Sequence, residues 1–288
     1  MELNKFIDHL SNMASDTGVS LYEIEEFIRR FYMYKPHNIV QCNYLHYCRA
    51  SINNPREIFK HISRCSYNPN PQNIKLQRCN YPEQQVFYAA APIESKAASC
   101  STTAILETAW EHIDDHDKST WQMTLSRWTP IRPLNLFILP YSKKSIEKNE
   151  VIRDAKSRFD TILQKSFSNE HSEAINYFKD SLEFISNVFC EKKNKEFWYR
   201  ISSAFYNCMM NFDSTKKKNV DGFLYPSANT EAAGLNVVLS KKLIDEKVVF
   251  CDYIMMYSIQ RDPNDLKSIA FLPSSNPAIP NSDGSINF

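Results

Sequence analysis

The stretch Asp221–Asn236, DGFLYPSANTEAAGLN, contains two of the four glycines in a chain of 288 residues. Gly222 precedes an apolar triplet that ends at Pro226, a pattern typical of a strand that runs into a tight turn. Such a turn holds Ser227 at the end of the strand, where a rigid scaffold can present polar groups to a ligand. An ordinary β-turn with a surface serine is the alternative.

Apolar patterns on both sides of this stretch predict an α+β fold. Helical spacing covers the first 40 residues, where Ser20 and Glu23 form a capping-box pattern, and returns from Arg153 to about Phe212. Because helices and strands occur in blocks, a regular βαβ array is not indicated. Strand-like runs occur at 85–90, 120–128, 134–139, 222–225, 235–239, 248–259 and 269–272.

We therefore expect three parts in the chain. Residues 1–40 form an N-terminal helical extension, and residues 41–273 form the main domain, with a helical insertion at about 143–218. Residues 274–288 are rich in Pro, Ser and Asn and are predicted to form a flexible tail.

Composition restricts the function. The formal net charge is +1, so no global attraction to nucleic acid or to an acidic membrane is expected. Four glycines leave no GxGxxG and no P-loop, so a bound dinucleotide must be held by side chains. The eight cysteines form no CxxC pair and are expected to be free thiols. Without an evident signal segment or apolar span, a cytoplasmic protein is expected.

Two further segments contain candidate site residues. Arg49 ends the aromatic stretch YLHYCR, and a buried arginine needs a partner, either a structural carboxylate or a phosphate. Glu107 lies on the predicted helix Thr102–His112 among apolar neighbours, where a solvated surface glutamate is the alternative.

Together these segments resemble the RES family, which is named for a recurrent Arg, Glu and Ser. The resemblance extends from about residue 44 to 240 in five ordered blocks. The matching positions are Arg49; Ser66-Tyr67-Asn68-Pro69; Arg78, Asn80, Pro82 and Tyr88; Thr103-Ala104-Ile105-Leu106-Glu107; and Asp221, Gly222, Tyr225, Pro226, Ser227 and Asn236. Gln77 and Glu83 depart from the family at positions where glycine is usual, which predicts a different turn geometry there.

The resemblance implies a fold like that of ADP-ribosyltransferases, with a split mixed sheet and flanking helices. It implies an enzyme that consumes NAD⁺ as its substrate, needs no further cofactor or metal, and cleaves the bond between nicotinamide and ribose. The implied catalytic residues are Glu107, Arg49 and Ser227. The implied NAD⁺-binding residues are Arg78, Asn80, Tyr88, Tyr67, Tyr225 and Asn236.

Within this scheme Glu107 would stabilise the charge that develops on the ribose, and the arginines would bind the two phosphates. Members of the family often act as toxins held inactive by a separate helix-turn-helix antitoxin, which makes such a protein a possible partner here. Water, phosphate or a protein side chain remains open as the acceptor.

The sequence leaves two other functions open and disfavours a third. A protein ADP-ribosyltransferase uses the same chemistry, and a catalytically inactive RES-fold binding module would use the same scaffold. A metal hydrolase built on His112 and His116 is disfavoured, because the segment HIDDH lacks the glutamate of HExxH.

Overall fold

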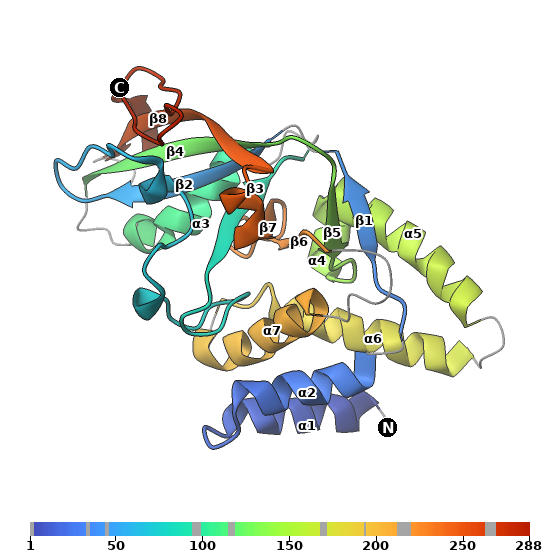
Figure 1. The fold of residues 1–288 in the computed structure, drawn as a ribbon. Coiled ribbons are helices and arrows are strands. Elements are labelled where there is room, and N and C mark those ends of the chain that lie inside the picture. Colours follow the sequence, from blue (N-terminus) through green and yellow to red (C-terminus); the bar gives the residue numbers. More distant parts are fainter. Residues whose placement is uncertain are drawn as a thin grey trace.

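The computed structural model describes residues 3–32, 35–43, 46–93, 99–114, 119–167, 172–192, 194–211, 220–262 and 269–288. Within these residues the protein has an α+β fold with eight α-helices and a mixed, open sheet of nine strands, as the sequence predicted at this level (Figure 1). The helices are α1 Leu3–Ser15, α2 Leu21–Tyr32, α3 Cys100–Asp114, α4 Lys143–Lys148, α5 Glu150–Ser166, α6 Ser172–Val188, α7 Lys195–Met210 and α8 Lys241–Asp245. The strands are β1 Ile39–Cys42, β2 Tyr47–Asn53, β3 Val86–Ala91, β4 Thr120–Pro130, β5 Leu134–Ile138, β6 Gly222–Pro226, β7 Leu235–Ser240, β8 Val249–Arg261 and β9 Ile269–Pro273.

The strands lie in the order β1-β5-β6-β7-β3-β2-β4-β8-β9. Between β2 and β3 the register contains a single pair, Cys48 opposite Ala90, whereas β2 pairs with β4 along its whole length. The two strands therefore part immediately after Cys48. The sheet consists of a five-stranded part and a four-stranded part that separate at this point.

The helical segment between β5 and β6 serves as their connection. These neighbours run parallel, with Leu136 opposite Gly222. Parallel strands need a long crossover to return the chain to its starting end, and α4 to α7 supply it. Phe137 and Phe223 from the two strands stack with their ring centroids 5.1 Å apart, and Phe205 of α7 meets both rings edge-on.

The two N-terminal helices lie against α7 in the lower part of Figure 1. The predicted capping box is present, since the backbone N–H of Ser20 donates to the Glu23 carboxylate at 2.7 Å and the Glu23 N–H donates to Ser20 Oγ at 3.2 Å. Glu25 of α2 is buried and accepts a hydrogen bond of 2.9 Å from the Tyr81 hydroxyl. This contact ties the extension to the loop that precedes β3.

Residues 274–288 differ from the flexible tail that their composition predicted. Ala278 and Ile254 of β8 exchange two backbone hydrogen bonds of 2.8 Å, and the Ile286 N–H donates to the Lys60 carbonyl at 2.9 Å. Ala278 and Ile286 are both 5% exposed. Two well-placed apolar side chains thus hold a segment that is polar overall.

All eight cysteines are free thiols, and six of them are buried, as expected for small core residues. In the part of the chain that the structure describes, no helix has both the length and the apolar character that crossing a bilayer requires.

Candidate functional site

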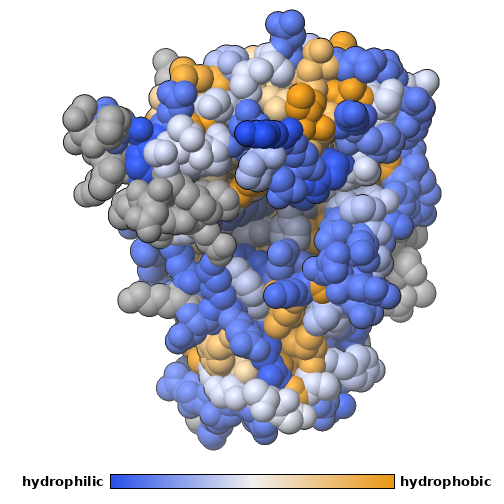
Figure 2. Space-filling model, turned by 90° about the vertical axis from the view of Figure 1, so that its left-hand side faces the viewer, coloured by the Kyte–Doolittle hydropathy of each residue, from blue (hydrophilic) through white to orange (hydrophobic). Residues whose placement is uncertain are grey.

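A cavity of about 500 Å³ opens where β2 and β3 part. Its walls come from β2, β3, β6, β7, α3, α7 and the loop 75–78. The space-filling view of this side shows a recess between the upper, sheet-bearing part and the lower, helical part (Figure 2). The charged side chains that line it are Arg49, Lys75, Arg78, Glu107 and Lys195. One carboxylate therefore lies among four basic side chains.

Glu107 projects from α3 and is held by neutral donors. Its Oε1 accepts a hydrogen bond from Ser227 Oγ at 2.5 Å and one from Asn236 Nδ2 at 2.9 Å. Asn229 donates its Nδ2 to Oε2 at 3.0 Å and its backbone N–H to Oε1 at 3.4 Å. Among the described residues no cation forms an ion pair with Glu107, so its negative charge is oriented but not neutralised.

Two of the three residues that donate to Glu107, Ser227 and Asn229, lie in a tight turn after β6, and the third, Asn236, lies in β7. The Ser227 N–H donates to the Gly234 carbonyl, and the Ala232 N–H donates to the Ser227 carbonyl, both at 2.8 Å. Gly234 has no room for a side chain, because a Cβ there would overlap the side chain of Thr103 on α3. Glycine thus lets the turn approach α3 closely enough for Asn229 and Ser227 to reach Glu107.

Arg49 crosses the gap between the diverging strands. Its Nη1 donates to the Tyr88 carbonyl of β3 at 2.6 Å, and its guanidinium lies 5.6 Å from the centre of the Phe87 ring. Burial lowers the pKa of the guanidinium from its usual value. Nε of Arg49 is shielded from solvent, and neither a hydrogen-bond acceptor for it nor a carboxylate partner occurs among the described residues. Arg49 is thus a partly buried cation with an unused donor at Nε, which suits binding of an anion.

Arg78 and Tyr88 both reach the cavity, and each also has a structural contact. Arg78 donates to the Glu191 carbonyl at 2.9 Å and lies 5.2 Å from the centre of the Tyr199 ring, so it joins the loop to the helical part. The hydroxyl of Tyr88 donates to Asn80 Oδ1 at 2.9 Å. Burial raises the pKa of the Tyr88 phenol, which therefore stays neutral.

Three predicted residues lie elsewhere than the resemblance implied. Tyr67 donates its hydroxyl to Asp245 at 2.6 Å and lines a separate cavity of about 540 Å³, so the structure does not bring it to the Glu107 site. Ser227 is fully buried behind Glu107 and does not line the cavity. Asn80 is 1% exposed and uses its amide to donate to the Lys75 and Tyr81 carbonyls, which shapes the loop.

Tyr225 and Asn236, two of the predicted NAD⁺-binding residues, line the cavity beside Glu107. Four residues that the sequence patterns did not predict complete the site: Asn229, Lys75, Lys195 and Tyr199. Asn229 lies two positions after Ser227, so the polar turn that identified Ser227 could also have identified Asn229. The basic residues had no local signal, because isolated lysines are common on any surface.

The turn at Glu83 keeps the geometry that glycine usually provides. Its φ is +66°, a left-handed conformation, whereas Gln77 is not among the described residues with positive φ. The predicted change of turn geometry is therefore not observed at Glu83. The side chains of His112 and His116, on which the disfavoured metal hydrolase rested, lie outside the described residues.

Comparison with known protein families gives no match, and comparison with curated proteins gives none either.

Proposed function

We propose that the cavity binds NAD⁺ and that the protein cleaves the bond between nicotinamide and ribose. The observation that carries this proposal is a pair of opposite, separately held charges in one cavity. Among the described residues, Arg49 is a partly buried cation without a carboxylate partner, and Glu107 is a carboxylate held only by neutral donors. NAD⁺ carries both complementary charges, a cationic nicotinamide ring and an anionic pyrophosphate.

The positive side chains suit the pyrophosphate. Guanidinium groups make paired hydrogen bonds with phosphate oxygens, and Arg49 has an unused donor at Nε. Arg78, Lys75 and Lys195 add positive charge to the lining of the cavity. Tyr88, Tyr199 and Tyr225 supply aromatic surface for the rings of the dinucleotide.

Glu107 suits the ribose. When the glycosidic bond breaks, its electron pair leaves with nicotinamide, which becomes neutral, and positive charge develops at the anomeric carbon. A fixed carboxylate stabilises that charge and can accept a hydrogen bond from a ribose hydroxyl. No strong general acid is needed, because the leaving group is already cationic before the bond breaks.

The acceptor is water in hydrolysis, which gives ADP-ribose and a proton, or inorganic phosphate in phosphorolysis. The parting of the sheet between β2 and β3, with α3 beside it, supports a relationship to the ADP-ribosyltransferase-like fold of the RES family. That relationship extends the proposal to a toxin-like role in the cytoplasm, controlled by a separate helix-turn-helix antitoxin.

The test is release of nicotinamide from NAD⁺ by the purified chain, with and without phosphate. Glu107→Gln keeps the shape of the side chain but removes its charge, and we expect it to lower turnover at least about 100-fold. Glu173→Gln, an exposed change on α6, is the matched control. No release by the unchanged protein would refute NAD⁺ cleavage. Transfer of labelled ADP-ribose to protein would instead identify an ADP-ribosyltransferase. Binding of NAD⁺ without either reaction would identify an inactive binding module.

A further inference from the structure

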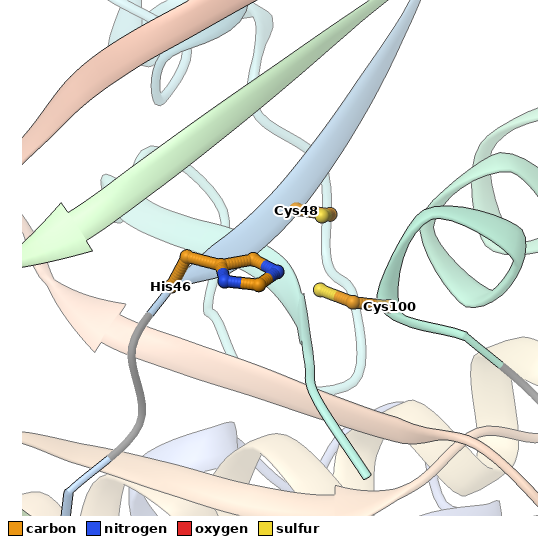
Figure 3. A group of neighbouring side chains, drawn as sticks. All are labelled: His46, Cys48 and Cys100. Atoms are coloured by element: carbon orange, nitrogen blue, oxygen red, sulfur yellow. The ribbon is translucent and has the colours of Figure 1, made fainter. Parts of the chain in front are cut away.

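On the α3 side of β2, three side chains with metal-binding atoms meet. His46 precedes β2, Cys48 lies in it, and Cys100 is the first residue of α3 (Figure 3). One ring nitrogen and two sulfur atoms lie within 4.8 Å of one another. Figure 3 shows the imidazole and both thiols directed toward a common point. In the described part of the chain no other group of His, Cys, Asp and Glu converges in this way.

We propose that His46, Cys48 and Cys100 bind a zinc ion. Two thiolates and one imidazole are a ligand set that Zn²⁺ favours, and the two sulfur charges balance the ion. Sulfur atoms on a tetrahedral zinc are roughly 3.8 Å apart, so the group needs to contract by no more than about 1 Å. With three protein ligands, the fourth position is left to solvent or another small ligand.

The surroundings of the three residues favour zinc binding. Cys48 and Cys100 are 4% and 6% exposed, whereas His46 is only partly buried and gives the ion a path from solvent. Ser101 Oγ lies 3.8 Å from Cys48 Sγ and can support the thiolate from outside the ligand shell. Cys100 follows Ser99, whose hydroxyl accepts from the Thr102 N–H at 3.1 Å, so its sulfur lies at a helix N-terminus, where negative charge is favoured.

Zinc binding would cost one hydrogen bond of the metal-free protein. In the metal-free protein the Cys100 thiol donates to the Ala90 carbonyl of β3 at 3.0 Å. Metal binding removes that proton and therefore that hydrogen bond. Ala90 also lines the adjacent cavity.

The ion would join the two elements that carry Arg49 and Glu107. Farther along the helix, a side-chain hydrogen bond of 3.2 Å from Thr108 Oγ1 to the Ala50 carbonyl joins α3 to β2. Zinc at the first turn of α3 adds a second fixed point seven residues before Glu107. We expect loading to slow amide exchange in the first turns of α3 and to raise the melting temperature.

The test uses the full chain, reduced and stripped of metal with a chelator, and titrated with Co²⁺ and then with Zn²⁺. One equivalent of Co²⁺ should produce thiolate-to-cobalt absorption in the near ultraviolet, and Zn²⁺ should displace it. His46→Gln and Cys100→Ser should weaken binding at least about 10-fold. Cys251→Ser, which alters a free thiol on β8 outside the group, should bind as the unchanged protein does.

His46→Gln removes a partly exposed ring and is expected to fold, so its result remains informative if Cys100→Ser does not fold. Absence of the cobalt signal in the reduced protein, or an equal signal in His46→Gln, would overturn the proposal. A Cys48–Cys100 disulfide in a reduced-then-oxidised sample that binds no metal would overturn it too and would identify the pair as a redox couple. Because metal binding is read spectroscopically, none of these outcomes depends on cleavage of NAD⁺.

Discussion

The hydroxyl of Ser227 donates a 2.5 Å hydrogen bond to Oε1 of Glu107, joining residues 120 positions apart in the sequence. Ser227 is fully buried and accepts a bond of 3.2 Å from the Thr230 N–H. It therefore orients the carboxylate from behind and is a positioning residue. The resemblance implied a catalytic role for Ser227, whereas its burial and hydrogen bonds favour a role in positioning Glu107.

Replacing Ser227 should consequently affect turnover more than binding. For Ser227→Ala we expect kcat for NAD⁺ cleavage to fall about 10- to 100-fold with KM changed less than about 3-fold, because Glu107 keeps its charge but loses its orientation. Ser181→Ala removes another fully buried hydroxyl, the one that accepts from Tyr32, and should lower stability without this effect. If Ser227→Ala changed only KM, we would infer that Ser227 contacts the substrate directly.

Arg49 should control affinity. Arg49→Lys keeps a positive charge but loses the paired donors, and we expect it to weaken NAD⁺ binding at least about 10-fold. Calorimetry in a Glu107→Gln background measures binding without turnover. Arg127→Lys, on the neighbouring strand, changes an arginine paired with Asp252 and should leave affinity unchanged. Equal affinities for both lysine variants would contradict the role of Arg49.

Close contact between the turn and α3 should depend on Gly234. Gly234→Ala places a methyl group against Thr103 and Thr230, and we expect a loss of about 1–3 kcal/mol in the free energy of unfolding, together with reduced turnover. Thr103→Ala in the same chain removes two of the three close atoms and should restore part of both losses. Gly18→Ala, where the nearest atom lies 3.2 Å away on an exposed side chain, is the control for denaturant unfolding.

Glycine at position 83 should stabilise the protein. Glu83 has a φ of +66°, which costs a residue with a Cβ about 1 kcal/mol. We expect Glu83→Gly to raise the free energy of unfolding by a few tenths of a kcal/mol up to about 1 kcal/mol, since the freer unfolded chain offsets part of the gain. Gln77→Gly lacks the left-handed conformation and should destabilise by about 0.5–1 kcal/mol. If Glu83→Gly and Gln77→Gly both raised or both lowered the free energy of unfolding, this explanation would be contradicted.

His37 should make the protein less stable in acid. Burial lowers the pKa of His37 from 6.5 to about 4, so between these values the unfolded chain binds the proton more readily than the folded one. The free energy of unfolding should therefore fall as the pH falls from 6.5 to 4, by about 2–3 kcal/mol from this residue. His37→Gln should flatten that decline relative to the exposed His9→Gln, as measured by urea unfolding across the range.

Local patterns identified most of the secondary structure, because an amphipathic helix or a buried strand shows its period in its own residues. The strands after residue 85, α3 and the capping box at Ser20 all follow from such patterns. Strands β1 and β2 were not predicted. The sequence of β2, YCRASIN, has no clear alternation, since it lies between two strands and faces a helix, a cavity and the core.

The candidate site likewise has features that the sequence predicts and features that depend on the tertiary structure. By itself the sequence singled out Arg49, Glu107 and the turn from Ser227 to Asn236 as candidate polar residues, and it placed Glu107 on a helix and Ser227 at the end of a strand. Only the tertiary structure decided that Ser227, Asn229 and Asn236 share one carboxylate, that Tyr67 faces another cavity, and that His46, Cys48 and Cys100 meet. These contacts join residues that are distant in the chain, and they arise from the strand order and from the divergence of β2 from β3. The periodicity of apolar residues along the sequence reports only local structure, so it cannot predict them.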